Sequence, residues 1–156
     1  MSFQRPPAAP DWADTVTGPM RRPGMTAREA FLFALERPPL WLRVAMVLRN
    51  IAVAPFRLKT GLKGKGHFLA RMPVVADKPE HFETGMADRH LTFTIATLIR
   101  GDMVGVTTAI WFNSWLGRVY LRLVMPGHIL ATRQIAGRIA HPLTRHLGEF
   151  SEGLKA

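Results

Sequence analysis

Cysteine is absent from the chain, and serine occurs only at positions 2, 114 and 151. Without cysteine there are no disulfides, thiolate nucleophiles or zinc–thiolate sites, and a secreted, disulfide-stapled scaffold is not expected. None of the serines stands in a Gly-x-Ser-x-Gly setting, which argues against a nucleophilic triad. No two of the six histidines have the four-residue spacing of a helical zinc site. We therefore expect no metal and no cofactor.

Long apolar runs are also missing. The most apolar stretch, Leu40 to Ala54, is interrupted by Arg43, Arg49 and Asn50, whereas a membrane span needs about 20 mostly apolar residues. Two interpretations of this stretch remain: a helix of the core, which we favour, and a helix lying in the plane of a membrane. The N-terminus lacks the apolar segment of a signal peptide, so we expect a cytoplasmic location.

What the chain does contain is typical of one globular domain. It has 156 residues, of which 47% are apolar and 21% charged. We expect a loose lead-in over 1–10, a single domain over 11–150 and a tail over 151–156. The net charge of +10 would attract nucleic acid, anionic membrane or acidic small molecules. Nucleic acid is the least expected, because aromatic and basic residues do not alternate.

The N-terminal half predicts a strand over Asp11–Thr17 and a helix over Ala27–Glu36. Thr26 and Glu29 have the spacing of a capping box at the start of that helix. Two further strands, Leu69–Val75 and Glu80–Met86, are expected around a turn at residues 76–79. Between helix and strands, the basic loop Gly61–Gly66 is not followed by the Lys-Ser/Thr of a phosphate-binding loop, so we interpret it as a linker.

The strongest pattern is a β-hairpin. Residues 89–100 and 103–113 flank Gly101-Asp102, a two-residue loop that fixes the register. Arg100 then lies opposite Met103 and Phe93 opposite Ile110, so that apolar residues meet on one face. The other face pairs Thr92 with Trp111, Thr94 with Ala109 and Ala96 with Thr107. These strands predict an antiparallel sheet and an α+β fold.

A long helix is expected after the hairpin, capped at Ser114 and kinked at Pro126-Gly127. One stripe of this helix, predicted to face the core, consists of Leu116, Val119, Leu123 and Leu130. Beyond the kink, the predicted helix continues with Ile129, Ala136, Ala140, Leu143 and Leu147 on its apolar face.

One polar cluster has two interpretations. Asp88-Arg89-His90 enters the hairpin, and the register brings Asn113 and Trp111 next to it. Such a group can bind an anion or orient a substrate, with histidine titrating near neutral pH. It can equally be a turn whose side chains order the backbone, and we favour this second interpretation.

Three sequence elements resemble a known family in the right order: Arg-Pro-Pro-x-Trp at 37–41, Asp-Arg-His-Leu at 88–91 and Leu-Gly-Arg-x-Tyr at 116–120. The resemblance is to the bacterial family known as domain of unknown function 2867 and covers most of residues 12–141. It implies a helix-grip, START-like fold, with a curved antiparallel sheet, a long C-terminal helix and a cavity between them. It also implies a reductase-type partner domain, since members occur fused behind such domains.

With that fold, the leading hypothesis is a pocket for an apolar or amphipathic small molecule. Gly127 and Ala131 would leave room where the helix crosses the sheet, and Arg89 at the rim would favour an acidic head group. The residues expected to bind the ligand are Arg89, His90, Leu91, Phe93, Ile110, Phe112, Leu116 and Leu123. A polar cluster of Asp88, Trp111, Asn113 and His128 is expected near them.

Two other classes of function stay open. The protein could be an enzyme of lipid or polyketide-like metabolism, with His90 or His128 as acid or base. It could also be a basic module that docks on an anionic membrane surface or a partner protein. The sequence assigns no catalytic residue and leaves the ligand, the reaction and the oligomeric state open.

Overall fold

A computed structural model of the chain describes residues 6–36, 40–41, 44, 47 and 72–146. The strands are β1 (Trp12–Pro19), β2 (Val74–Lys78), β3 (His81–Ala87), β4 (Leu91–Arg100), β5 (Met103–Phe112) and β6 (Thr144–His146). The helices with assigned bounds are α1 (Ala27–Leu35) and α3 (Trp115–Ala136), and residues 40–41, 44 and 47 are also helical. The predicted α+β class is confirmed.

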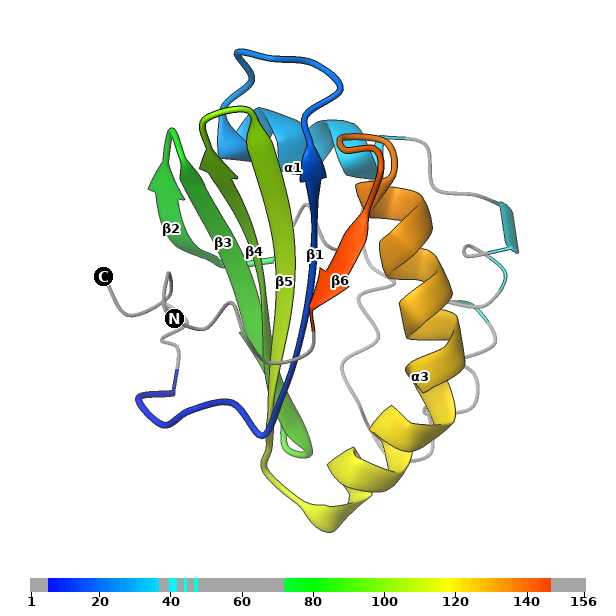
Figure 1. The fold of residues 1–156 in the computed structure, drawn as a ribbon. Coiled ribbons are helices and arrows are strands. Elements are labelled where there is room, and N and C mark those ends of the chain that lie inside the picture. The colour runs from blue at the N-terminus through cyan, green and yellow to red at the C-terminus, as the bar shows by residue number, and fades with distance from the viewer. Residues whose placement is uncertain (1–5, 37–39, 42–43, 45–46, 48–71, 147–156) are drawn as a thin grey trace.

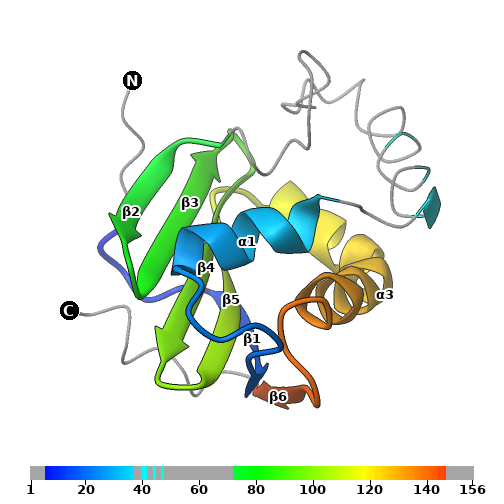
Figure 2. The same cartoon turned by 90° about the horizontal axis from the view of Figure 1, so that it is seen from above.

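The six strands form one antiparallel sheet in the order β2-β3-β4-β5-β1-β6. The sheet curves, and α1 and α3 lie together on its concave face (Figures 1 and 2). α1 packs mainly on β3 and β4, whereas α3 packs on β5 and β1. Because the two helices cover opposite ends of the same face, the space between them is bounded by the middle of the sheet.

The predicted hairpin is confirmed in full register. β4 and β5 pair from Leu91 with Phe112 to Arg100 with Met103, and Phe93 lies opposite Ile110. Gly101 takes a φ of 57°, a backbone conformation that glycine adopts without the steric cost of a side chain. The loop therefore holds the register that places the apolar residues of both strands on the concave face.

The predicted helix start is confirmed as well. The hydroxyl of Thr26 accepts a hydrogen bond from the backbone N–H of Glu29, whose carboxylate accepts from the N–H of Thr26 at 2.8 Å. α1 then buries the side that faces the sheet. On that side Phe31 meets Phe82 of β3, with ring centroids 5.2 Å apart. This aromatic pair anchors α1 over the β3–β4 end of the sheet.

Two predicted boundaries were wrong. The turn expected at residues 76–79 lies at Pro79-Glu80, because β2 runs on through Lys78. The helix expected to extend to Leu147 ends at Ala136, and β6 follows it and pairs with β1. Gly137 follows α3, and Ile139 and Ala140 fold back onto the apolar cluster that holds Ala30 of α1.

The predicted face of α3 was also wrong. Val119, Leu123 and Leu130 are 54%, 80% and 49% exposed, and Trp115 beside them is 71% exposed, so most of the stripe faces solvent, although Leu123 also reaches the cavity. The inward side of the helix carries Gly117, His128 and Ala131 together with larger apolar residues such as Leu121. α3 contains no acidic residue, and the exposed Arg118 and Arg122 lie beside the apolar stripe.

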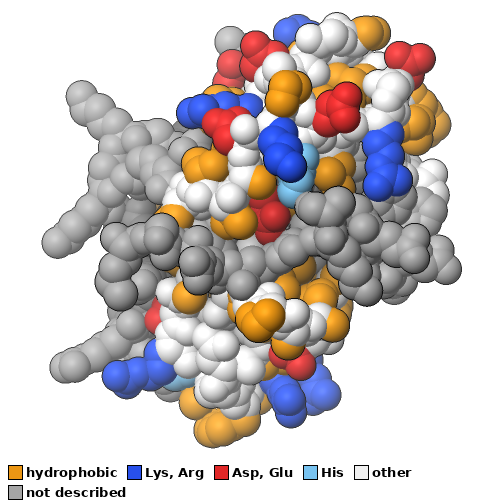
Figure 3. Space-filling view, turned by 90° about the vertical axis from the view of Figure 1, so that its left-hand side faces the viewer, with side chains coloured by type: hydrophobic (Ala, Val, Ile, Leu, Met, Phe, Trp, Pro, Cys, Tyr) orange, Lys and Arg blue, Asp and Glu red, His pale blue; other side chains and the backbone are white. Residues whose placement is uncertain are grey.

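Other predictions concern segments that are largely or wholly outside the described residues. These are most of Leu40–Ala54, the loop Gly61–Gly66, residues 69–71, Leu147 and the tail at 151–156. Within the described part of the chain, no helix is long and apolar enough to cross a membrane. In Figure 3, the coloured Lys and Arg side chains lie scattered among acidic and apolar ones, without gathering into one basic patch on that face.

Candidate functional site

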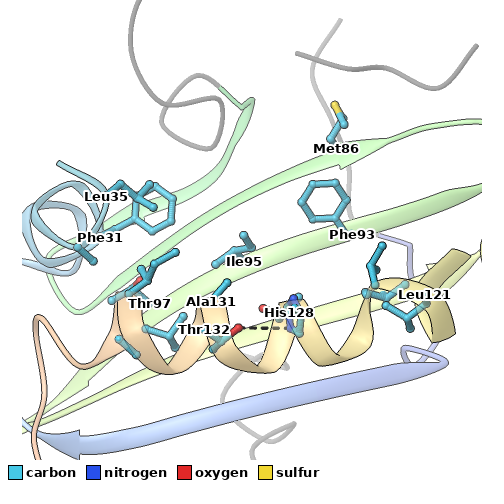
Figure 4. Close-up of a pocket in the computed structure, with 18 of the residues that line it drawn as sticks. Phe31, Leu35, Met86, Phe93, Ile95, Thr97, Leu121, His128, Ala131 and Thr132 are labelled. Atoms are coloured by element: carbon cyan, nitrogen blue, oxygen red, sulfur yellow. Dashed lines mark hydrogen bonds between the residues drawn. The ribbon is translucent and has the colours of Figure 1, made fainter. Parts of the chain in front are cut away.

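A cavity of about 420 Å³ lies between the concave face of the sheet and the two helices (Figure 4). Phe31 and Leu35 of α1 line one end, and Met86 and Phe93 lie at the other. Ligand pockets in proteins usually measure about 300–1,000 Å³ and are mostly apolar. The cavity therefore has the size and lining of a small-molecule site.

The strand side of the cavity is apolar because of the hairpin register. Side chains of a strand alternate between the two faces, so residues two apart in the chain line the same space. Phe93, Ile95 and Thr97 of β4 line it, and so do Val106, Thr108 and Ile110 of β5. The wall thus follows directly from the alternation that predicted the hairpin.

The helix side of the cavity includes two small residues among larger ones such as Leu121 and Val124. Gly127 and Ala131 of α3 both line the cavity, where the sequence led us to expect room. A Cβ atom added at Gly127 would meet nothing within 4 Å. At Gly117, near the start of α3, a Cβ atom would come within 2.3 Å of the backbone oxygen of His90. Gly117 thereby allows the helix to dock closely at one end and span the cavity.

A buried polar group adjoins this apolar space. Asp14 of β1 is 1% exposed, and its Oδ1 accepts a hydrogen bond from Nε of Arg145 in β6 at 2.6 Å. Asp14 pairs across the sheet with Thr108, which lines the cavity. The Nε2 atom of His128, also a lining residue, is 3.9 Å from Oδ2 of Asp14. Two strands and one helix therefore bring a carboxylate, a guanidinium and an imidazole together.

His128 is held by its surroundings. Its ring meets the ring of Trp12 edge-on at 5.4 Å, and its Nε2 lies 3.4 Å from the hydroxyl of Thr132 one helical turn later (Figure 4). Burial lowers the pKa of His128 below its ordinary value, Asp14 acts to raise it, and Arg145 acts to lower it. The imidazole is therefore neutral at neutral pH and can both donate and accept a hydrogen bond.

The structure divides the residues that were expected to bind the ligand. Leu91, Phe93, Ile110 and Leu123 line the cavity. Arg89, His90, Phe112 and Leu116 are not among the lining residues. Arg89 is exposed at the turn before β4, and the Phe112 ring lies 5.7 Å from the guanidinium carbon of Arg118. The expected pocket residues thus fall into a lining group and a group at the sheet end.

The polar cluster predicted at the turn is not a single site. The side-chain amide of Asn113 donates to the backbone oxygen of Asp88 at 2.7 Å and lies 3.1 Å from the hydroxyl of Thr92. His90 Nδ1 lies 3.0 Å from the hydroxyl of Ser114. These contacts order the turn, which is the interpretation we favoured.

The other two members of that predicted cluster lie elsewhere. Trp111 donates from Nε1 to the backbone oxygen of Ala8 at 2.8 Å, and it pairs with Thr92 on the face of the sheet opposite the cavity. His128 stands in the cavity wall beside Asp14. Of the expected polar residues, His128 is therefore the one that the fold brings to the cavity.

Sequence reasoning missed three residues of the site. Asp14 and Arg145 are 131 positions apart, and no local pattern connects them. Trp41 lines the cavity and donates from Nε1 to the side chain of Gln134 in α3 at 2.7 Å. An aspartate placed among the apolar and threonine residues of a predicted strand was the one available signal for Asp14, because a buried carboxylate needs a partner.

The family resemblance is confirmed. The chain matches the family described as Protein of unknown function (DUF2867) over residues 7–135, and it belongs to that family. The match includes Asp14 and His128 but ends before Arg145. Comparisons with curated proteins and with solved structures gave no match.

Proposed function

We propose that this member of the DUF2867 family has a helix-grip, START-like fold and binds an apolar or amphipathic small molecule between its sheet and α3. The observation that supports this most is the cavity of about 420 Å³ with its apolar strand wall. An apolar space of this size is poorly occupied by water, so an apolar ligand gains free energy by filling it.

The position of the polar groups bears on the orientation of the ligand. His128, Thr132 and Thr108 line the cavity at one side, and the rest of the wall is mostly apolar. A ligand with one polar end would place that end here, since a buried polar group needs a hydrogen-bond partner. Arg89 lies outside the lining, so its position gives no support to an acidic head group held there.

Native mass spectrometry of the purified protein tests the proposal. We expect a co-purified small molecule, released on unfolding, at up to one per chain. Ala131→Phe should reduce its occupancy because position 131 lines the cavity, whereas Leu130→Phe should not, because Leu130 is 49% exposed on the outer side. Equal occupancy in both variants would place the molecule outside the cavity. If no small molecule co-purifies with the protein and the folded protein also fails to bind an added apolar dye such as Nile red, the proposal is wrong.

A second candidate is an enzyme in which His128 acts as a general base. The neutral imidazole at the cavity wall, with a carboxylate 3.9 Å from Nε2, supports this candidate. Hydrolysis of p-nitrophenyl octanoate gives a simple test. Turnover that His128→Gln abolishes and His90→Gln preserves would support it, since His90 is bonded into the turn. Turnover that is undetectable, or that both variants lose equally, would count against it.

A third candidate is docking on an anionic membrane surface, and the outer side of α3 supports it. Trp115, Val119 and Leu130 are exposed there beside Arg118 and Arg122, a combination that suits a helix lying at a lipid interface. Flotation with phosphatidylglycerol vesicles should then carry the protein, and Leu130→Glu should reduce it. Equal flotation with phosphatidylcholine vesicles would contradict the electrostatic part.

Other expectations stay predictions. These are the cytoplasmic location, the reductase-type partner domain implied by the family, and the expectation that nucleic acid is not a partner.

A further inference from the structure

One carboxylate oxygen behind the residues that line the cavity has no hydrogen bond. Oδ1 of Asp14 is bonded to Arg145 at 2.6 Å, but Oδ2 accepts no hydrogen bond from the described residues although it is fully buried. Leaving a buried acceptor unpaired costs free energy, and native proteins rarely do so without a reason. Oδ2 of Asp14 therefore needs a partner that the described part of the chain does not supply.

Among the described residues, a ring nitrogen lies near Oδ2 of Asp14 but is too far away to bond to it. Nε2 of His128 is 3.9 Å from Oδ2 of Asp14, beyond hydrogen-bonding distance. An oxygen atom placed to the side of the line that joins them could lie about 2.8 Å from both, which is the usual length of such a bond. That oxygen would have to donate to Oδ2, because a carboxylate only accepts, and accept from Nε2–H of the imidazole. A hydroxyl group does both.

We propose that the cavity takes an uncharged ligand with a hydroxyl group, an alcohol or phenol, whose oxygen lies between Nε2 of His128 and Oδ2 of Asp14. This inference rests on the proposed function and adds the chemical class of the ligand. The apolar part of the ligand fills the space along Phe93, Ile95 and Ala131. Its hydroxyl group donates to Asp14 and is held by the imidazole.

The charges around the polar group favour a neutral ligand. Among the described residues, the charged and titratable groups that meet at this point are Asp14 from β1, Arg145 from β6 and His128 from α3. Asp14 and Arg145 neutralise each other, and burial keeps the imidazole neutral near neutral pH. A carboxylate ligand would lie against the carboxylate of Asp14. An ammonium ligand would lie near Arg145, whose charge already offsets that of Asp14.

Neighbouring hydroxyl groups are compatible with this geometry. Thr132 lies 3.4 Å from Nε2 of His128, a long contact that a ligand oxygen could replace. Thr108 pairs with Asp14 across the sheet and lines the cavity, so the carboxylate lies next to the lining at this point. Trp12 covers the other side of the imidazole through its edge-on contact. The ring of His128 is thereby fixed with its Nε2 directed toward the acid.

Displacement of Nile red by four ligands of similar length tests this inference near neutral pH: 1-nonanol, octyl methyl ether, nonanoic acid and nonylamine. The first two are isomers that differ in whether the oxygen carries a proton. We expect 1-nonanol to bind about tenfold more tightly than the ether, because a hydrogen bond to a charged acceptor is worth about that factor. We expect the acid and the amine to bind more weakly than the alcohol as well.

Asp14→Asn and His90→Gln separate the roles. Asp14→Asn should remove the preference for the alcohol over the ether, whereas His90→Gln should keep it, because His90 is bonded to Ser114 at the turn and does not line the cavity. The comparison of ligands in the native protein needs no variant, so it decides the matter even where Asp14→Asn fails to fold.

Each outcome of the series has a definite meaning. Equal affinity of the alcohol and the ether would mean that water, and no ligand hydroxyl, occupies the gap; this overturns the inference and leaves the proposed function standing. Tightest binding of the acid or the amine would overturn it in the same way. No binding of Nile red or of any of the four ligands would overturn both the inference and the proposed function.

Discussion

Replacing Ala131 with leucine should make the protein more stable, although the residue lies on the side of α3 that faces the sheet. Ala131 lines the cavity, so the added carbon atoms would enter existing space instead of displacing neighbours. Each buried CH₂ group is worth about 0.8 kcal/mol. Leucine adds three carbon atoms and the cavity is partly open, so we expect a gain of about 1 kcal/mol in the free energy of unfolding.

Ala30 provides the matched control. Its side chain is 0% exposed and packs with Val104 and Ile139; Ala30 and Val104 do not line the cavity, although Ile139 does. Ala30→Leu should therefore cost about 1–3 kcal/mol, the usual penalty for overpacking a filled core. Urea unfolding followed by tryptophan fluorescence would measure both variants, and Ala131→Leu should also weaken the binding of Nile red. If Ala131→Leu destabilises the protein as much as Ala30→Leu, the space is not a cavity in solution.

Three further changes should have distinct effects. Gly117→Ala should lower the free energy of unfolding by about 1–3 kcal/mol, because the added Cβ would lie 2.3 Å from a backbone oxygen. Gly127→Ala should raise it by up to about 1 kcal/mol, because the added Cβ meets nothing within 4 Å. Equal effects of the two variants in thermal unfolding would contradict the close docking of α3 at Gly117. Arg145→Leu should lower the free energy of unfolding by about 3 kcal/mol, because it leaves the buried carboxylate of Asp14 unpaired, and adding Asp14→Asn to the same chain should restore part of that loss. If urea unfolding shows that the losses of the two substitutions simply add, the ion pair is not formed in solution. Burial lowers the pKa of His128 in the folded state, so the unfolded state binds the proton more readily and the free energy of unfolding should fall as the pH drops through about 6.5. His128→Gln should flatten this part of the profile of unfolding free energy against pH. An unchanged profile in the variant would refute the buried position of His128.

The parts of the fold that sequence reasoning recovered are local. The register of β4 and β5 is set by two loop residues, Gly101 and Asp102, and by alternation along each strand. The start of α1 is set by Thr26 and Glu29, which are three residues apart. In both cases the residues that determine the structure are close together in the chain, so the local sequence pattern is enough to predict it.

The face of α3 could not be read in the same way, because the usual rule assumes a filled core. The rule places the largest apolar residues inward, and it chose Val119, Leu123 and Leu130, which are exposed. The side that lines the cavity carries Gly127 and Ala131 beside larger residues such as Leu121 and Val124. A helix that spans an open space shows a weaker inward pattern than one that packs tightly.

The polar site was missed for a different reason. Asp14, His128 and Arg145 come from β1, α3 and β6, and only the three-dimensional fold brings them together. β6 itself is a strand of three residues inside the segment that was predicted to be helical, and its pairing with β1 leaves no local pattern. The position of Arg145 beside Asp14 therefore depends on sheet topology.

The most direct test of the central claim, that a ligand occupies the space between sheet and α3, is an NMR titration of the labelled protein with 1-nonanol. We predict shifts of the methyl signals of Ile95, Val106 and Ala131, which line the cavity, and none for Val119 and Leu130, which point outward. Shifts confined to Val119 and Leu130, with the cavity signals unchanged, would contradict the account.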